Sequence, residues 1–175
     1  MLVPSGIIIR SFSRKDWFTS KMVDRGNVLK RVCEEKLGGI VLKSEQKEAV
    51  LSLLSGKDVF AVLPTGFGKS LIYQSFVFAR EILDGLSPSI IVVIPLRSIV
   101  QEQLTSNEFE LKAVELTLQD DVLKSVQEGA VDVVYSSAEN VLNDKFLSLL
   151  REQSSPFKQR LKLIVVDESH TVFTW

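Results

Sequence analysis

Short apolar runs alternate with amphipathic stretches from residue 58 onward. Runs rich in aliphatic and β-branched residues predict strands at 58–63, 89–94, 113–118, 131–135 and 161–166. Helical spacing of apolar residues predicts helices at 69–83, 99–104, 121–128 and 141–151. Near-continuous apolar strands that alternate with helices indicate the α/β class, with a parallel sheet covered by helices on both faces.

The region before the first of these strands is helical in pattern only from residue 28. Residues 28–37 and 45–54 have helical spacing, and Ser44 is a suitable N-cap for the second helix. Residues 1–27 mix Ser, Arg, Lys and Gly without clear periodicity. We interpret 1–27 as a poorly defined N-terminal extension, ordered in part at best, and expect the domain to span 28–175.

Composition limits the number of domains and the contacts with nucleic acid, metal and membrane that we expect. A chain of 175 residues that is 45% hydrophobic can bury a core as one domain. Its net charge of −1 gives no global attraction to nucleic acid, so the basic residues of the first third form either a local site or a solvated face. One cysteine, Cys33, leaves no disulfide or zinc cluster within the chain, and no apolar run is long enough to span a bilayer. We expect an intracellular protein with no membrane contact.

A glycine-rich turn joins the first strand of the alternating region to its helix. Gly66 and Gly68 allow tight turns and close approach of the backbone to an anion. Lys69 and Ser70 follow at the start of the helix, where free N–H groups favour phosphate. Lys69 is expected to neutralise phosphates, and the Ser70 hydroxyl is expected to coordinate Mg²⁺.

Two carboxylates follow the last predicted strand. Asp167 and Glu168 come directly after an apolar run, so they lie at the carboxyl edge of the sheet, as the glycine turn does. Mg²⁺ prefers one or two carboxylates together with water and phosphate oxygens. Asp167 is therefore a candidate metal ligand, and Glu168 a candidate general base for water.

Five segments of the chain resemble the motifs of RecQ-type DNA helicases and occur in the same order along the sequence. The match departs from the usual pattern at Ala138, where proline is usual, and at Ser169, where alanine is usual. The Pro-Thr-Arg-Glu motif of the related RNA helicases is absent after Ile94. The matching segments are 43–49, 63–74, 95–103, 135–139 and 167–170.

This resemblance implies a P-loop NTPase domain of RecA-like fold that binds ATP and Mg²⁺ and acts on DNA. It implies ATP-driven 3′-to-5′ unwinding in DNA repair and recombination, with a nuclear location in a eukaryote. Catalysis is assigned to Lys69, Asp167 and Glu168, and the metal to Ser70 and Asp167. Coupling between DNA and hydrolysis is assigned to His170 and Trp175. Contacts to ATP are assigned to Lys43, Gln46 (which reads the adenine), Pro64, Thr65, Gly66, Phe67, Gly68, Lys69 and Ser70. Contacts to nucleic acid are assigned to Pro95, Arg97, Ser98, Gln103, Ser137 and Glu139.

The resemblance also implies that parts of the family's machinery lie outside these 175 residues. The family hydrolyses ATP between two RecA-like domains, and the second domain supplies an arginine to the transition state. A strand that follows Asp167 in the family would lie beside the strand that precedes the glycine turn, so we expect 59–63 to have an exposed edge. We expect the 175-residue polypeptide to hydrolyse ATP barely and not to unwind DNA, whether the end at Trp175 is biological or not.

Other functions remain open from the sequence. The chain is alternatively a catalytically dead remnant or interaction module that keeps the phosphate loop for folding only. A transporter ATPase is disfavoured because Leu54-Ser55-Gly56 precedes the loop, whereas the transporter signature follows it. A small-molecule kinase is disfavoured because nothing resembles an acceptor site.

Overall fold

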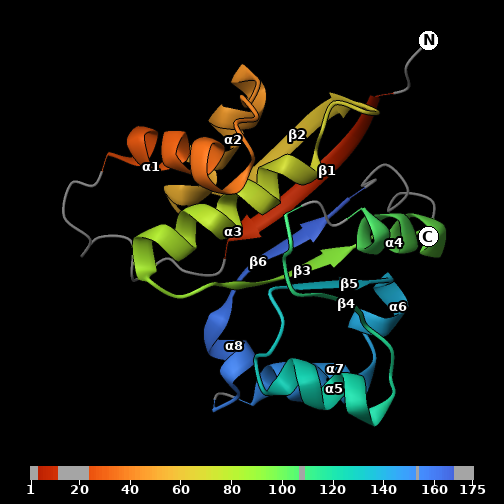
Figure 1. The fold of residues 1–175 in the computed structure, drawn as a ribbon. Coiled ribbons are helices and arrows are strands. Elements are labelled where there is room, and N and C mark those ends of the chain that lie inside the picture. Colours follow the sequence, from red (N-terminus) through yellow and green to blue (C-terminus); the bar gives the residue numbers. More distant parts are fainter. Residues whose placement is uncertain (1–3, 12–23, 107–108, 153, 168–175) are drawn as a thin grey trace.

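A six-stranded sheet with helices on both faces forms the framework of the molecule (Figure 1). The computed structural model describes residues 4–11, 24–106, 109–152 and 154–167. The strand order is β2-β1-β6-β3-β5-β4. The strands are β1 (Pro4–Ser11), β2 (Val59–Pro64), β3 (Ser89–Val93), β4 (Ala113–Glu115), β5 (Val133–Ser136) and β6 (Leu161–Val166).

The larger part of the sheet is parallel. β3 pairs in parallel with β5 on one side and with β6 on the other, and β4 pairs in parallel with β5. The main-chain N–H of Asp167 donates to the carbonyl of Val93 at 3.0 Å, which extends the β3–β6 ladder one residue further. The α/β class and the mostly parallel sheet predicted from the sequence are therefore confirmed.

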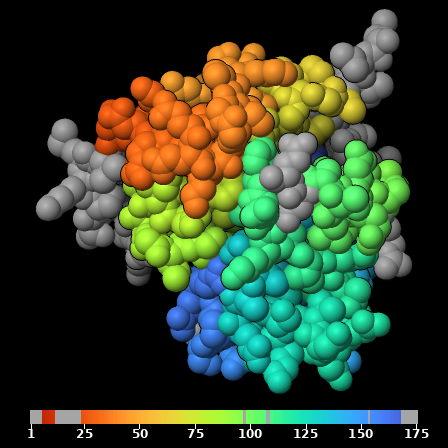
Figure 2. Space-filling model, viewed as in Figure 1, coloured from red at the N-terminus to blue at the C-terminus, as the bar shows by residue number. Residues whose placement is uncertain are grey.

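Helices cover the two faces unequally. One face packs against α1 (Arg25–Arg31), the π-helical turn η1 (Val32–Lys36), α2 (Ser44–Leu54) and α3 (Ser70–Asp84). The other packs against α5 (Asp120–Gln127), α7 (Asp144–Arg151) and α8 (Pro156–Arg160). The remaining helices, α4 (Arg97–Thr105) and α6 (Ala138–Val141), follow the carboxyl ends of β3 and β5. Figure 2 shows α1 and α2 in orange above α3, with the cyan helix α5 forming the opposite layer.

Strand β1 differs from the expectation for the N-terminal region. Part of the segment that we interpreted as an extension, Pro4–Ser11, lies inside the sheet and runs antiparallel to both of its neighbours, β2 and β6. Ile7 and Ile9 are fully buried under the helices of the first face. The run of three isoleucines at 7–9 is too short to show alternation, so its strand character comes from partners that are distant in sequence.

The sheet ends at β2. The exposed edge that we expected at 59–63 is present, because β2 is the last strand of the sheet in the described part of the chain; its other side pairs with β1, which was not predicted. Phe60 and Val62 are 66% and 56% exposed, and Ile8 of β1 is 40% exposed on the same face. The face opposite α1–α3 is thus apolar and open at this end.

Candidate active site

The predicted phosphate loop is a tight turn between β2 and α3. The N–H of Phe67 donates to the carbonyl of Pro64 at 3.1 Å, and Gly66 and Gly68 have φ of 77° and 85°. These left-handed conformations suit glycine because a side chain is strained there. Pro64, Thr65 and Gly66 are exposed, whereas Lys69 is only 9% exposed. The loop therefore presents its backbone outward and holds its lysine against the protein.

Gln46 supports the inner side of this loop. Its carboxamide Nε2 donates to the carbonyls of Phe67 and Gly68, both at 3.0 Å, and the residue is 2% exposed. Its Oε1 accepts from the N–H of Lys43 at 2.8 Å, so the start of α2 is tied to the loop. We expected Ser44 to be the N-cap of this helix, but Ser44 is its first residue, and the Gln46 side chain serves the N–H of Lys43, the N-cap residue. The adenine contact of Gln46 stays a prediction.

Lys43 reaches over the loop from the same helix start. Its Nζ lies 4.0 Å from the centre of the Phe67 ring, within the range of a cation–π interaction, and 3.4 Å from the Phe67 carbonyl. Lys43 and Gln46 thus contact the loop from two sides. The structure brings together the residues that the sequence assigned to the adenine motif and to the phosphate motif, which are more than 20 positions apart.

Lys69 and Asp167 are brought together across the sheet. The Nζ of Lys69 lies 4.0 Å from Oδ1 of Asp167, whose side chain is 16% exposed. Ser70, the first residue of α3, is partly buried beside Lys69. A hydroxyl and a carboxylate are oxygen ligands that suit Mg²⁺, and a buried lysine next to glycine turns suits phosphate, so these residues fit ATP–Mg²⁺. Glu168, His170 and Trp175 lie outside the described residues.

A pair of buried tyrosines beside Asp167 was missed by the sequence analysis. Tyr73 of α3 and Tyr135 of β5 are 1% and 3% exposed, and the Tyr73 hydroxyl donates to Oε1 of Gln103 at 3.3 Å. Burial raises the pKa of Tyr73 well above its usual value, and the neighbouring Tyr135 and Asp167 raise it further. Burial also raises the pKa of Tyr135. A tyrosine in an apolar pattern gives no sequence signal of this arrangement.

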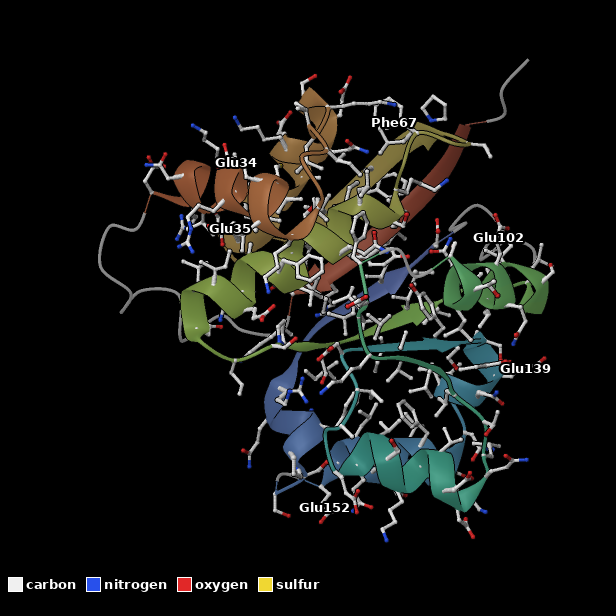
Figure 3. All side chains as sticks on the ribbon, in the orientation of Figure 1. Glu34, Glu35, Phe67, Glu102, Glu139 and Glu152 are labelled. Atoms are coloured by element: carbon white, nitrogen blue, oxygen red, sulfur yellow. The ribbon has the colours of Figure 1, made fainter. Side chains whose placement is uncertain are left out.

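The residues assigned to nucleic acid lie around the carboxyl ends of β3 and β5. Pro95 and Ser98 flank the start of α4, at which Arg97 is the first residue, while Gln103 lies further along that helix. Ser137 caps α6, its hydroxyl accepting from the N–H of Asn140 at 3.3 Å. Figure 3 shows Phe67, Glu102 and Glu139 toward this same end of the sheet. The predicted nucleotide and nucleic-acid residues therefore share one end of the fold.

Three cations of the first third form ion pairs with acids in the described part of the chain. Lys30 and Arg31 form i,i+4 pairs with glutamates on the surface, at 3.9 and 3.0 Å, and Lys36 lies 3.3 Å from Glu81. The pKa of Glu35 is lowered by its hydrogen bond to Arg31. These pairs favour the solvated face over a basic binding patch.

The described residues include neither a membrane-spanning helix nor a cluster of metal-ligating side chains. No helix there has the length and apolar character that crossing a membrane requires. No cluster of three or more His, Cys, Asp or Glu side chains there is arranged to hold a metal ion.

Comparison with known proteins adds evidence that is independent of this geometry. Residues 43–175 match the DEAD/DEAH box helicase family. ATP-dependent DNA helicase Q-like 5 of Arabidopsis thaliana is 35% identical over 74% of this chain, and RecQ-like DNA helicase blm-1 of Caenorhabditis elegans is 30% identical over 87%. ATP-dependent DNA helicase RecQ of Haemophilus influenzae is 28% identical over 89%. The chain spans only 14%, 16% and 24% of the lengths of these relatives, in the same order.

Proposed function

Because the chain belongs to the DEAD/DEAH box helicase family, with RecQ-type relatives, we propose that it forms one side of the ATP–Mg²⁺-binding site of a DNA helicase. The observation that supports this most directly is the pairing of Lys69 with Asp167 at 4.0 Å, next to a loop held open by two glycines. The sheet brings these two side chains together, which supports a role for Lys69 in binding phosphate and for Asp167 in holding the metal.

Each residue of the site has a distinct task in this proposal. The N–H groups after Gly66 bind phosphate oxygens, and Lys69 neutralises their charge. Ser70 and Asp167 hold Mg²⁺, which when bound offsets negative charge on the phosphates. Gln46 keeps the loop in its open shape through its bonds to Phe67 and Gly68, which use both N–H groups of its carboxamide. For the adenine contact that the resemblance implies, Gln46 exchanges these bonds for bonds to the base. Glu168 takes a proton from the attacking water.

The nucleic-acid side of the proposal concerns α4 and the β5–α6 junction. Main-chain and polar groups at the start of α4 and around Ser137 bind the DNA backbone, since exposed N–H groups and hydroxyls suit phosphates without reading the base sequence. The bond from Tyr73 to Gln103 joins the helix that follows the phosphate loop to α4. In the whole protein these contacts serve ATP-driven 3′-to-5′ unwinding inside the cell.

A polypeptide of these 175 residues is expected to bind ATP but to hydrolyse it only slowly. In the resemblance, a second RecA-like domain contributes the arginine that stabilises the transition state, and such arginines are worth on the order of 1,000-fold or more in rate. We therefore expect no unwinding from the 175 residues alone, and robust DNA-stimulated hydrolysis by a monodisperse preparation would contradict this.

Binding of a fluorescent ATP analogue in the presence of Mg²⁺ tests the proposal. Lys69→Ala removes a charge-assisted contact worth about 1.5–3 kcal/mol, so affinity is expected to fall by about 10- to 100-fold. Lys57→Ala serves as the matched control, because Lys57 is exposed and precedes β2 at the opposite end of that strand. Absence of binding by the unaltered chain would favour the alternative in which the phosphate loop serves folding only.

A further inference from the structure

Strand β1 is the only link within the sheet between the two strands that carry the proposed site, among the residues that the structure describes. β2, which leads into the phosphate loop, pairs with β1 alone, and β6, which leads into Asp167, pairs with β1 on its other side. Figure 1 shows the red strand β1 lying between the yellow β2 and the blue β6. No hydrogen bond of the sheet joins β2 directly to β6 in this part of the chain.

The register of β1 is defined on both sides. Ile8 lies opposite Phe60 of β2 and opposite Val166 of β6, so one residue fixes the relative position of both neighbours. β2 continues from Phe60 to Pro64 before its loop begins, whereas β6 reaches Asp167 immediately after Val166. This offset allows the chain to return through the loop so that Lys69 meets Asp167.

Contacts on β1 hold that register in place. Ile7 and Ile9 are fully buried among the helices, whereas Ile8 between them points to the open face. A slip of one residue would exchange the two faces, exposing the buried pair. At the far end of the strand, the N–H of Ser11 donates to Oδ1 of Asp58 at 2.9 Å, directly before β2 begins.

We propose that β1 is a positioning element of the nucleotide site, which sets the registration between the phosphate-loop strand and the strand that ends at Asp167. The strand supplies none of the residues assigned to the nucleotide or the metal, and it acts through the placement of Lys69 relative to Asp167. This inference rests on the proposed ATP–Mg²⁺ site, and it assigns a role in that site to a segment before the helicase match, which begins at residue 43.

Reversible disulfides test the proposal in one folded molecule. In a Cys33→Ser background, Ile8→Cys is combined with Phe60→Cys or with Val166→Cys, which are the directly opposite residues. Opposite residues in antiparallel strands have Cα atoms about 4.5–5.5 Å apart, which suits a disulfide. The comparison variant joins Ile8→Cys to Val62→Cys, which faces the same way but lies opposite Gly6.

Both matched pairs are expected to close under mild oxidation and to keep the affinity for the fluorescent ATP analogue within about twofold of their reduced forms, because a register-matched disulfide adds no displacement. The shifted pair is expected to close about tenfold more slowly, since its Cβ atoms lie farther apart. When a stronger oxidant closes the shifted pair, the affinity for the fluorescent ATP analogue is expected to fall at least about tenfold and to recover on reduction.

The outcomes separate this inference from the proposed function. Equal closure of matched and shifted pairs, or full affinity in the closed shifted pair, would overturn the role of β1. A shifted pair that never closes, beside matched pairs that do, supports a fixed register. An unaltered chain that binds no nucleotide would refute the proposed function, and the closure rates would still report whether β1 lies in register between β2 and β6.

Discussion

Substitution of Gly68 by alanine probes how the phosphate loop is held. A Cβ at Gly68 would lie 2.8 Å from Nε2 of Gln46, and the residue has φ of 85°. Gly66 offers a matched control, since it also has positive φ, at 77°, but a Cβ there would meet nothing within 4 Å. Gly66→Ala therefore carries the backbone strain alone, whereas Gly68→Ala carries the strain and the displacement of Gln46.

The magnitudes follow from these contacts. Holding alanine in a left-handed conformation costs about 1–2 kcal/mol, and this cost is common to both variants. Gln46 would have to leave its two carbonyl partners, and each lost bond costs about 1 kcal/mol because the groups are buried. We expect Gly68→Ala to be less stable than Gly66→Ala by about 2 kcal/mol, out of a total loss of about 3–4 kcal/mol.

Urea unfolding followed by far-ultraviolet circular dichroism measures this difference in the free energy of unfolding, from the midpoint urea concentrations of variants that share the same denaturant dependence. The double variant Gly68→Ala with Gln46→Ala provides a further check, because removal of the Gln46 side chain removes the clash. Its loss is expected to be less than the sum of the two single losses. Equal unfolding midpoints for Gly66→Ala and Gly68→Ala would refute the account of Gln46 as the support of the loop.

Further predictions concern other parts of the fold. Arg160 lies 2.8 Å from Asp132 and donates to the carbonyls of Ser87 and Gly129, so Arg160→Met is expected to lower the free energy of unfolding by about 3 kcal/mol. Lys124→Ala, which breaks an exposed ion pair, is expected to lower it by at most about 0.5 kcal/mol, and equal losses in urea titrations would contradict this. The pKa of Tyr73 is raised in the folded state, so the stability that this tyrosine contributes is present below the usual tyrosine pKa of about 10 and is lost as the pH rises above that value. Tyr73→Phe is therefore expected to reduce the fall in melting temperature at alkaline pH, and an unchanged fall would exclude Tyr73 as its source. Phe60→Thr is expected to reduce self-association in analytical ultracentrifugation, because it removes the largest exposed apolar side chain at the free edge, whereas Val41→Thr, in a loop, is expected to have no effect.

Elements with a local sequence pattern were the ones that could be predicted. Strands such as β3 and β6 are largely apolar runs, and the glycine turn between β2 and α3 has a composition that few other structures require. Their order along the chain is enough to predict a parallel sheet, because such strands need helical crossovers. The meeting of Lys69 and Asp167 was predicted for the same reason, since both follow carboxyl ends of strands.

Features that depend on distant partners were not predictable. β1 has three consecutive isoleucines and no alternation, and only the free sides of β2 and β6 make it a strand. The carboxamide of Gln46 would suit a solvent-exposed position equally well, and its burial against the loop depends on how α2 packs. Tyr73 and Tyr135 likewise become neighbours only through the packing of α3 on β5, because nothing in their local sequence links them.

The dependence of nucleotide affinity on Mg²⁺, compared between the unaltered chain and Asp167→Asn, shows whether the phosphate loop and Asp167 form one nucleotide site. If the phosphate loop and Asp167 form one site, Mg²⁺ is expected to strengthen binding of the fluorescent ATP analogue about tenfold over a solution containing EDTA. In Asp167→Asn that strengthening is expected to disappear, while affinity in EDTA is retained through Lys69. An equal effect of Mg²⁺ on both proteins would contradict the claim that the two motifs form a single nucleotide site.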